Sequence, residues 1–143
     1  MTEKKKSEAK FTLSKEILRR YLSTLYDKEV TICGAWRLGG QKSGGYGDLK
    51  GFGYGFPYVI EFVVGGETKR VVLETMRPEG FGHDTSSDRA QILLWQHSAF
   101  GKLPRHVRSL DVGAFVPSSK RLASLGKCSE FFILTEFVDG QLY

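Results

Sequence analysis

Residues 58–76 read YVIEFVVGGETKRVVLETM, and this stretch decides the fold. Two runs rich in β-branched and other apolar residues, residues 58–64 and 68–76, flank the sequence Gly65-Gly66-Glu67. Such residues favour strands, and a glycine pair between two such runs is typical of a tight hairpin. We therefore expect two antiparallel, neighbouring strands here.

The sequence before this hairpin contains a helix, a strand and a glycine-rich segment. In residues 14–26 apolar side chains recur every three to four residues, which predicts an amphipathic helix with Ser14 as its N-cap. Residues 30–38 are rich in β-branched and aromatic residues and predict a strand. Eight glycines follow in residues 39–55, a density that excludes a helix there.

The sequence after the hairpin predicts a second helix and two further strands. The helix is expected over residues 88–100, with Ser86 or Ser87 as its N-cap. Residues 109–116 and 131–137 are strand-like. The side chains expected on one face of this helix are those of Ala90, Leu93, Leu94 and His97.

The predicted order of elements is helix, strand, glycine-rich segment, strand, strand, helix, strand, strand. Strands in a row, with helices placed on the sheet rather than between every pair of strands, favour the α+β class over a wound parallel sheet. We therefore expect an α+β domain with a five-stranded antiparallel sheet. One helix is inserted between strands 3 and 4, and the other is N-terminal to the first strand.

Length and composition favour a single globular domain. With 143 residues, 41% of them hydrophobic and 26% charged, the chain can bury a core of ordinary size. Residues 1–10 are lysine-rich and are expected to be a mobile basic tail, which leaves residues 11–143 as one domain. No apolar segment follows the basic N-terminus, so we expect a cytoplasmic protein with no membrane contact.

Cysteine content and charge argue against two other classes of protein. Cys33 and Cys128 are far apart, and with three scattered histidines they predict neither a disulfide framework nor a zinc site. The net charge is +5, but acidic residues separate the basic ones, which argues against nucleic acid as a partner. An RNA-stacking platform would need the aromatic residues between the glycines, which are Tyr46, Phe52, Tyr54 and Phe56. We favour the interpretation that these side chains cover a hairpin.

The glycine-rich segment GGQKSGGYGDLKGFGYGFP, residues 39–57, is a candidate binding site. Glycine removes side-chain bulk and lets main-chain N–H groups approach a polyphosphate, and Lys42 or Lys50 would add positive charge. The segment lacks the P-loop pattern GxxxxGK[ST] and precedes a strand rather than a helix. A flexible hairpin loop and a phosphate-binding loop are therefore equally consistent with it.

The element order, with its third strand VVLE and its last strand FILTEFVDG, resembles the small lobe of the protein-kinase-like fold. Within that fold it is most similar to the aminoglycoside phosphotransferase family. Residues 134–142, LTEFVDGQL, resemble the family's last small-lobe strand where it enters the interlobe hinge. Residues 88–115 resemble its helix, loop and fourth strand. The resemblance extends from about residue 13 to residue 143 and covers one lobe.

This resemblance implies an ATP site. Thr135 would lie behind the adenine, and the main chain of Glu136 and Val138 would form hydrogen bonds with the edge of the base. Leu38 and Val72 would sandwich the base from the sheet side. The other residues implied are those of the glycine loop over the phosphates and one near the ribose: Gly44, Gly45, Gly47 and Gln141. For this role the last strand must leave its main-chain edge free beside the base.

Two positions depart from the family pattern. Its third strand carries a lysine that holds phosphates, paired with a glutamate on the next helix, whereas the aligned residues here are Glu74 and Gln91. A carboxylate repels phosphate. Either the register is shifted, or a lysine of the glycine loop substitutes, or the site binds nucleotide weakly or not at all. The basic residues that could take over are Lys69, Arg70, Arg77, Lys42 and Lys50.

The family's catalytic base and magnesium-binding aspartate belong to a large helical lobe outside these 143 residues. We therefore expect the nucleotide-binding small lobe of an ATP-dependent small-molecule phosphotransferase, inactive as this chain and with no catalytic residue or metal ligand of its own. Its cofactor is ATP, with magnesium held by the other lobe. Its partners are that lobe, or a second copy bound through the exposed lobe face.

His83 and Asp84 are adjacent, but they precede a small-lobe helix, so we expect a loop or capping pair rather than catalytic groups. The alternative function is a non-catalytic binding or regulatory module. Such a module would keep the kinase-like sheet but would have lost nucleotide chemistry, as Glu74 and Gln91 suggest.

Overall fold

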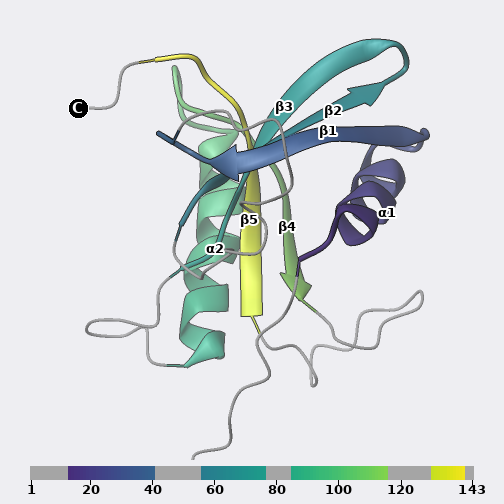
Figure 1. The fold of residues 1–143 in the computed structure, drawn as a ribbon. Coiled ribbons are helices and arrows are strands. Elements are labelled where there is room, and N and C mark those ends of the chain that lie inside the picture. The colour runs from purple at the N-terminus through teal and green to yellow at the C-terminus, as the bar shows by residue number, and fades with distance from the viewer. Residues whose placement is uncertain (1–12, 41–55, 77–84, 116–129, 141–143) are drawn as a thin grey trace, which may run out of the picture.

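The computed structural model describes residues 13–40, 56–76, 85–115 and 130–140 (Figure 1). Its helices and strands are α1 (Lys15–Tyr26), β1 (Val30–Arg37), β2 (Tyr58–Val64), β3 (Glu67–Glu74), α2 (Ser86–Phe100), β4 (Ser109–Phe115) and β5 (Glu130–Glu136). All five strands form one antiparallel sheet in the order β1-β2-β3-β5-β4. The expected α+β class is confirmed, with α2 inserted between β3 and β4.

The predicted hairpin is formed by β2 and β3. Gly65 and Gly66 connect the strands with φ angles of 57° and 79°. Positive φ at both central residues matches the right-handed twist of the strands, and glycine adopts it without a steric penalty. β3 begins at Glu67 and ends at Glu74, so it starts one residue earlier and stops two residues earlier than predicted.

The last strand does not lie at an edge of the sheet. β5 is paired with β3 on one side and with β4 on the other, and Thr135 lies opposite both Val72 and Ser109. The expectation of a free main-chain edge beside Thr135 was therefore wrong. Strand order in a sheet depends on contacts distant in sequence, which the local pattern of residues 131–137 does not contain.

The first helix forms as its sequence predicts. The Ser14 hydroxyl accepts a hydrogen bond from the Ile17 N–H, and Asp27 ends the helix in the left-handed conformation. Leu18 and Leu22, one turn apart, are buried against the sheet. In Figure 1, α1 and α2 lie on either side of β5.

The second helix differs from the prediction at its start and in its buried face. It begins at Ser86, and its N-cap is Thr85, whose hydroxyl accepts from the Asp88 N–H. α2 packs on β4 and β5 through Arg89, Ala90 and Leu93. Because successive helical residues are turned by about 100°, Leu94 points away and is 52% exposed. Of the residues expected on one face with Leu94, Ala90 and Leu93 are buried, so Leu94 does not share their burial.

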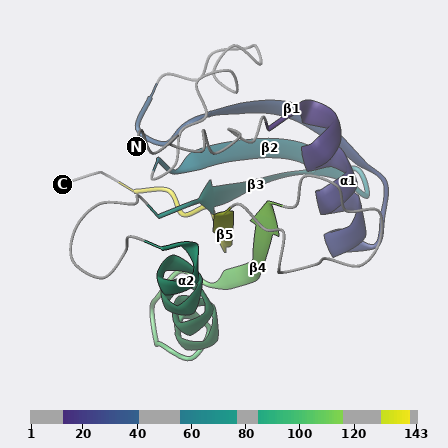
Figure 2. The ribbon, with the colours of Figure 1, turned by 90° about the horizontal axis from the view of Figure 1, so that it is seen from below.

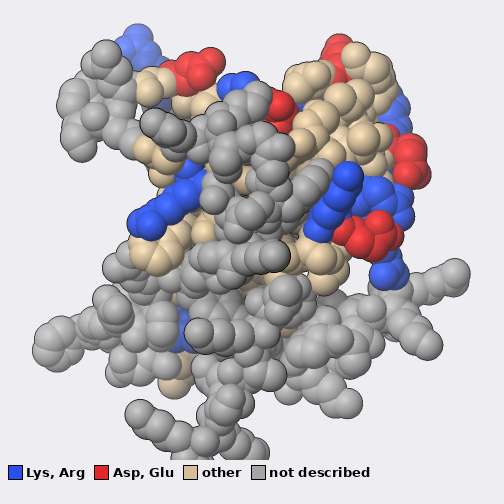
Figure 3. Space-filling view, in the orientation of Figure 1, with Lys and Arg blue, Asp and Glu red and all other residues tan. Residues whose placement is uncertain are grey.

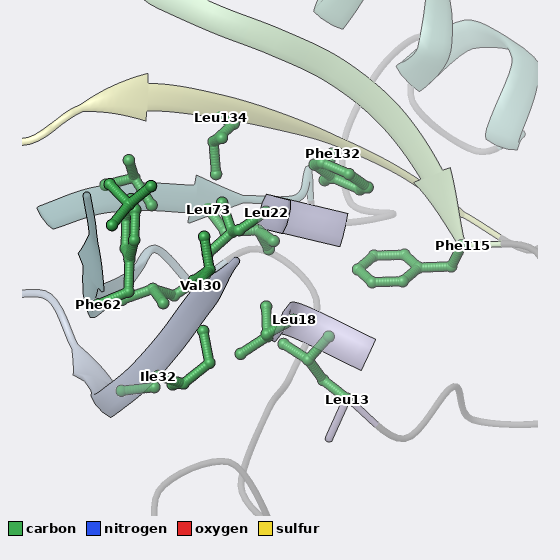
Figure 4. Close-up of a cluster of buried hydrophobic side chains, with 14 residues drawn as sticks. Leu13, Leu18, Leu22, Val30, Ile32, Phe62, Leu73, Phe115, Phe132 and Leu134 are labelled. Carbon is green, nitrogen blue, oxygen red and sulfur yellow. The ribbon is translucent and has the colours of Figure 1, made fainter. Parts of the chain in front are cut away.

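The main hydrophobic core lies between α1 and one face of the sheet (Figures 2 and 4). Phe132 stands near its centre, with its ring centroid 5.4 Å from that of Tyr21 and 5.3 Å from that of Phe115. The buried members are Leu13, Leu18, Leu22, Val30, Ile32, Ala35, Ile60, Phe62, Val64, Val71, Leu73, Phe115, Phe132 and Leu134. Neither α1 nor α2 is long and apolar enough to cross a membrane.

Candidate functional site

A smaller apolar cluster occupies the opposite face of the sheet. Its members are Trp36, Val59 and Val72, which are buried, and Leu38 and Phe137, which pack against them. We call these five residues the second-face cluster. Leu38 and Val72, two residues predicted to sandwich a base, are thus brought together although 34 positions separate them in the chain.

Strand alternation and register explain this cluster. Val71 and Leu73 point into the main core, so Val72 between them faces the other way. Val59 is the cross-strand partner of both Trp36 and Val72.

The same row continues into β5, because Val72 lies opposite Thr135. Four strands therefore contribute to one row of the sheet, and the predicted site residue Thr135 is the immediate neighbour of the cluster. β4 extends the row with Ser109, the other partner of Thr135.

The chain leaves the sheet just after this row. The Glu136 N–H still donates to the Arg108 carbonyl at 3.1 Å, and Glu136 lies opposite Val71. Phe137 then packs on the second-face cluster, and the Val138 side chain is 61% exposed. Within the described residues, the main-chain N–H and C=O of Val138 form no hydrogen bond. Just beyond Glu136, therefore, the chain offers main-chain groups to a ligand beside the second-face cluster.

Arg70 lies beside the second-face cluster, but its guanidinium already forms an ion pair and contacts two aromatic rings. Its Nε donates to Glu61 Oε2 at 2.8 Å, and its guanidinium lies 5.6 Å from the ring centroids of both Trp36 and Phe137. Lys69 is turned to the opposite face, with its Nζ 5.4 Å from the Tyr26 ring centroid. Neither residue takes the place of a phosphate-binding lysine at Glu74.

Glu74 lies on the same face as Val72 at the end of β3. Its side chain is exposed, yet surrounding atoms displace enough water to raise the pKa of the carboxyl above its usual value. Its strand partner is Ile133. Gln91, predicted to replace the helix glutamate, is exposed on α2, outside the Arg89, Ala90 and Leu93 stripe that packs on the sheet.

Trp36, Val59 and Phe137 belong to the second-face cluster but were not predicted as site residues. Hairpin register would have indicated Val59, because it is the residue that pairs with Val72 in a two-residue turn. Trp36 requires the pairing of β1, which a glycine-rich connection does not fix, and a bulge between Ile32 and Gly34 shifts it further.

Several predicted residues lie outside the described part of the chain. Phe56 is described, and the Arg37 guanidinium stacks over its ring at 3.7 Å from the centroid. Among residues 13–40, 56–76, 85–115 and 130–140, no group of three or more His, Cys, Asp or Glu side chains is arranged to hold a metal ion. The predicted residues outside these ranges are Gly44, Gly45, Gly47, Gln141, Lys42, Lys50, Arg77, His83, Asp84, Tyr46, Phe52 and Tyr54.

The arrangement combines a buried apolar row, a main-chain segment whose hydrogen-bonding groups no described residue uses, and the carboxylate of Glu74. The first two suit a planar heterocycle with a polar edge, and the third repels anions. Comparison with protein-family models, with curated proteins and with solved structures finds no match to this chain.

Proposed function

We propose that this chain is the nucleotide-binding small lobe of an ATP-dependent small-molecule phosphotransferase similar to the aminoglycoside phosphotransferases. One observation carries the proposal. Among the residues predicted to surround one base, Val72 and Thr135 are cross-strand partners, and Leu38 packs against the cluster that contains Val72. The inserted helix α2 and the order of the strands along the chain are also those expected of such a lobe.

The chemistry of a purine supports this choice. A purine has two flat apolar faces and an edge that carries hydrogen-bond donors and acceptors. Leu38 and Phe137, which are only partly buried, pack on the buried Val59 and Val72 and make this part of the sheet apolar. Val138, which follows Phe137, has an N–H and a C=O without partners in the described fold. Main-chain groups that point at a ligand need no particular side chain, and they recognise the edge by geometry.

The chain's part in the reaction is to hold and orient the nucleotide. Phosphoryl transfer depends on positioning and on stabilisation of charge around the transferred group, and bound ATP would supply that group. The second-face cluster holds the base and excludes water from its face. We assign no catalytic residue and no metal ligand to this chain, and we place those groups, with magnesium, in a partner lobe.

An amide chemical-shift titration tests the proposal. The ¹⁵N-labelled 143-residue chain is titrated with Mg-ATP into the millimolar range. We expect shifts at Leu38, Val72 and residues 135–138, while Leu22 in the main core stays unchanged because α1 covers the opposite face. Spectra of a folded chain that do not change at millimolar nucleotide would contradict the proposal.

A pair of variants at Val138 isolates the main-chain contact. Val138→Pro removes the N–H that no described residue uses, and Val138→Ala shortens the side chain but keeps the N–H. We expect the proline variant to bind ATP about fivefold to tenfold more weakly, the size of one hydrogen bond of ~1–1.4 kcal/mol, and the alanine variant to bind as before. Equal weakening by both would show that the amide is not the contact.

The second candidate function is a binding or regulatory module without nucleotide chemistry. The observation that favours it is Glu74, a carboxylate where the family pattern has a phosphate-binding lysine. A folded chain that gives no response to ATP, yet captures a protein partner on the second face of the sheet, would favour this module over the nucleotide-binding lobe.

A further inference from the structure

The charge of Glu74 is not neutralised within the described fold. Side chains alternate along a strand, so Glu74 lies on the face of Val72, two residues and about 7 Å further along β3. Its carboxylate takes part in no hydrogen bond or ion pair in the described residues. The two basic side chains of β3 are engaged elsewhere, Arg70 with Glu61 and Lys69 over Tyr26.

The register fixes the direction in which a bound nucleotide runs. Glu136, where the chain leaves the sheet, lies opposite Val71, and Thr135 lies opposite Val72. Glu74 is therefore on the far side of Val72 from that exit. A purine that turns its hydrogen-bonding edge to the exit carries its sugar on the opposite side of the ring. The sugar, and any phosphates beyond it, then point toward Glu74.

A carboxylate in that direction repels phosphate. Surrounding atoms displace part of its hydration shell, which is the cause of its raised pKa, so its field is screened less than that of a fully hydrated surface charge. A pH of 8, well above the ordinary pKa of a glutamate side chain, favours the charged form of the carboxyl. Thus, among the described residues, the second-face cluster and Val138 fit the base of ATP, whereas Glu74 does not fit its phosphates.

We propose that Glu74 makes this site selective for a purine nucleoside over the corresponding nucleoside triphosphate. The inference rests on the proposed function, which supplies the position of the base. Glu74 acts as a specificity-determining residue. It leaves the contacts of the base at the second-face cluster and at Val138 unchanged, and it lowers affinity with each negative charge added to the sugar.

The test compares three ligands of increasing charge. Dissociation constants of adenosine, AMP and ATP are measured by amide chemical-shift titration of the full chain at pH 8 with EDTA, so that no metal ion masks the phosphates. We expect adenosine to bind about tenfold more tightly than ATP, which corresponds to one like-charge interaction of ~1.4 kcal/mol, with AMP between them. Glu74→Gln should bring ATP within about twofold of adenosine, and Glu74→Lys should make ATP the tighter ligand.

The matched control is Glu67→Lys, which makes the same charge change at the start of the same strand. Glu67 has a side chain 75% exposed and lies roughly 23 Å from Glu74 at the usual rise of a strand, so the ligand order should not change. Equal binding of adenosine and ATP by the natural chain, or an unchanged ratio in Glu74→Gln, overturns this inference and leaves the proposed function standing. A folded chain that binds neither ligand overturns both.

Discussion

At the scale of single residues, the contact between Tyr21 and Asp111 joins the N-terminal helix to β4, the edge strand farthest from β1 in the sheet. The Tyr21 hydroxyl donates to Asp111 Oδ2 at 2.5 Å, and the tyrosine ring meets Phe132 edge-on. Burial, and then the hydrogen bond and charge of Asp111, raise the pKa of Tyr21 far above its usual value. The folded protein therefore favours the neutral hydroxyl.

Removal of this hydroxyl should destabilise the fold. Tyr21→Phe keeps the ring but leaves the partly buried Asp111 carboxylate without its donor, so we expect the free energy of unfolding at pH 7 to fall by about 1–3 kcal/mol in urea titrations. Tyr26→Phe is the control, because the Tyr26 hydroxyl forms no hydrogen bond in the described residues. Equal losses in the two variants would contradict the prediction.

The same pair gives a pH dependence with a fixed sign. The unfolded chain releases the Tyr21 proton near pH 10, while the folded chain retains it to higher pH. The stability contributed by the neutral hydroxyl is therefore fully present below about pH 10 and is lost as the pH rises above it. Urea titrations at pH 7 and pH 10.5 should show a smaller difference between the natural chain and Tyr21→Phe at the higher pH.

Some residue-level features follow from sequence and others do not. Ser14 and the spacing of Leu18 and Leu22 are local signals, and the cap and buried face of α1 were predicted from them. Gly113 shows the limit. A Cβ there would collide with the Phe132 ring on the neighbouring strand, so glycine is required by a contact between residues 19 positions apart. No pattern within β4 contains that information.

At the scale of elements, the existence of each helix and strand was predicted and most of the errors are at the ends. Whether a segment forms a strand depends on its β-branched and apolar content over the whole segment. The residue at which a helix or strand ends depends on only one or two local hydrogen bonds. The start of α2 is an example. Ser86, Ser87 and Thr85 are all residue types that cap helices, and only the observed bonds identify Thr85.

The cap of α2 can be tested directly. Thr85 accepts from the Asp88 N–H and donates to the Asp88 carboxylate at 2.7 Å. We expect Thr85→Ala to lower the free energy of unfolding by about 1 kcal/mol, because an N–H of the first turn loses its acceptor. Ser86→Ala should change it by less than about 0.5 kcal/mol, since Ser86 is already inside the helix. A larger loss for Ser86→Ala would place the cap there instead.

At the scale of the whole molecule, the candidate site combines parts that sequence predicts with a placement that it does not. The resemblance predicted Leu38, Val72 and Thr135 as residues around the base, at a strand end, in a hairpin strand and in a hinge-like segment. Their meeting depends on β5 lying between β3 and β4, which was not predicted. The same pairing places Glu74 on the far side of Val72 from the point where the chain leaves the sheet. The carboxylate at this position, where the family pattern has a lysine, therefore predicts which ligand charge the site favours.

The central position of β5 also makes a prediction about cooperativity. Phe132 and Leu134 belong to the core under α1, whereas Ile133 between them is buried on the face to which α2 packs. One strand thus contributes side chains to both halves of the molecule. Amides of Ile133 and Leu134 should therefore exchange hydrogen only on global unfolding, with a protection free energy equal to that from urea titration, while amides of the edge strand β4 exchange faster.

Leu134→Ala separates a cooperative fold from two independent halves. Removal of a fully buried leucine side chain should cost about 2–5 kcal/mol and should lower the hydrogen-exchange protection of the α1 and α2 amides by the same amount, because both helices depend on β5. Ile17→Ala, at a residue 39% exposed on α1, is the control and should lower protection by less than about 1 kcal/mol. A loss of protection confined to the α1 amides in the Leu134 variant would contradict the prediction, because it would mean that the helices unfold as separate units. In that case the row from Trp36 to Thr135 would not lie on one rigid sheet.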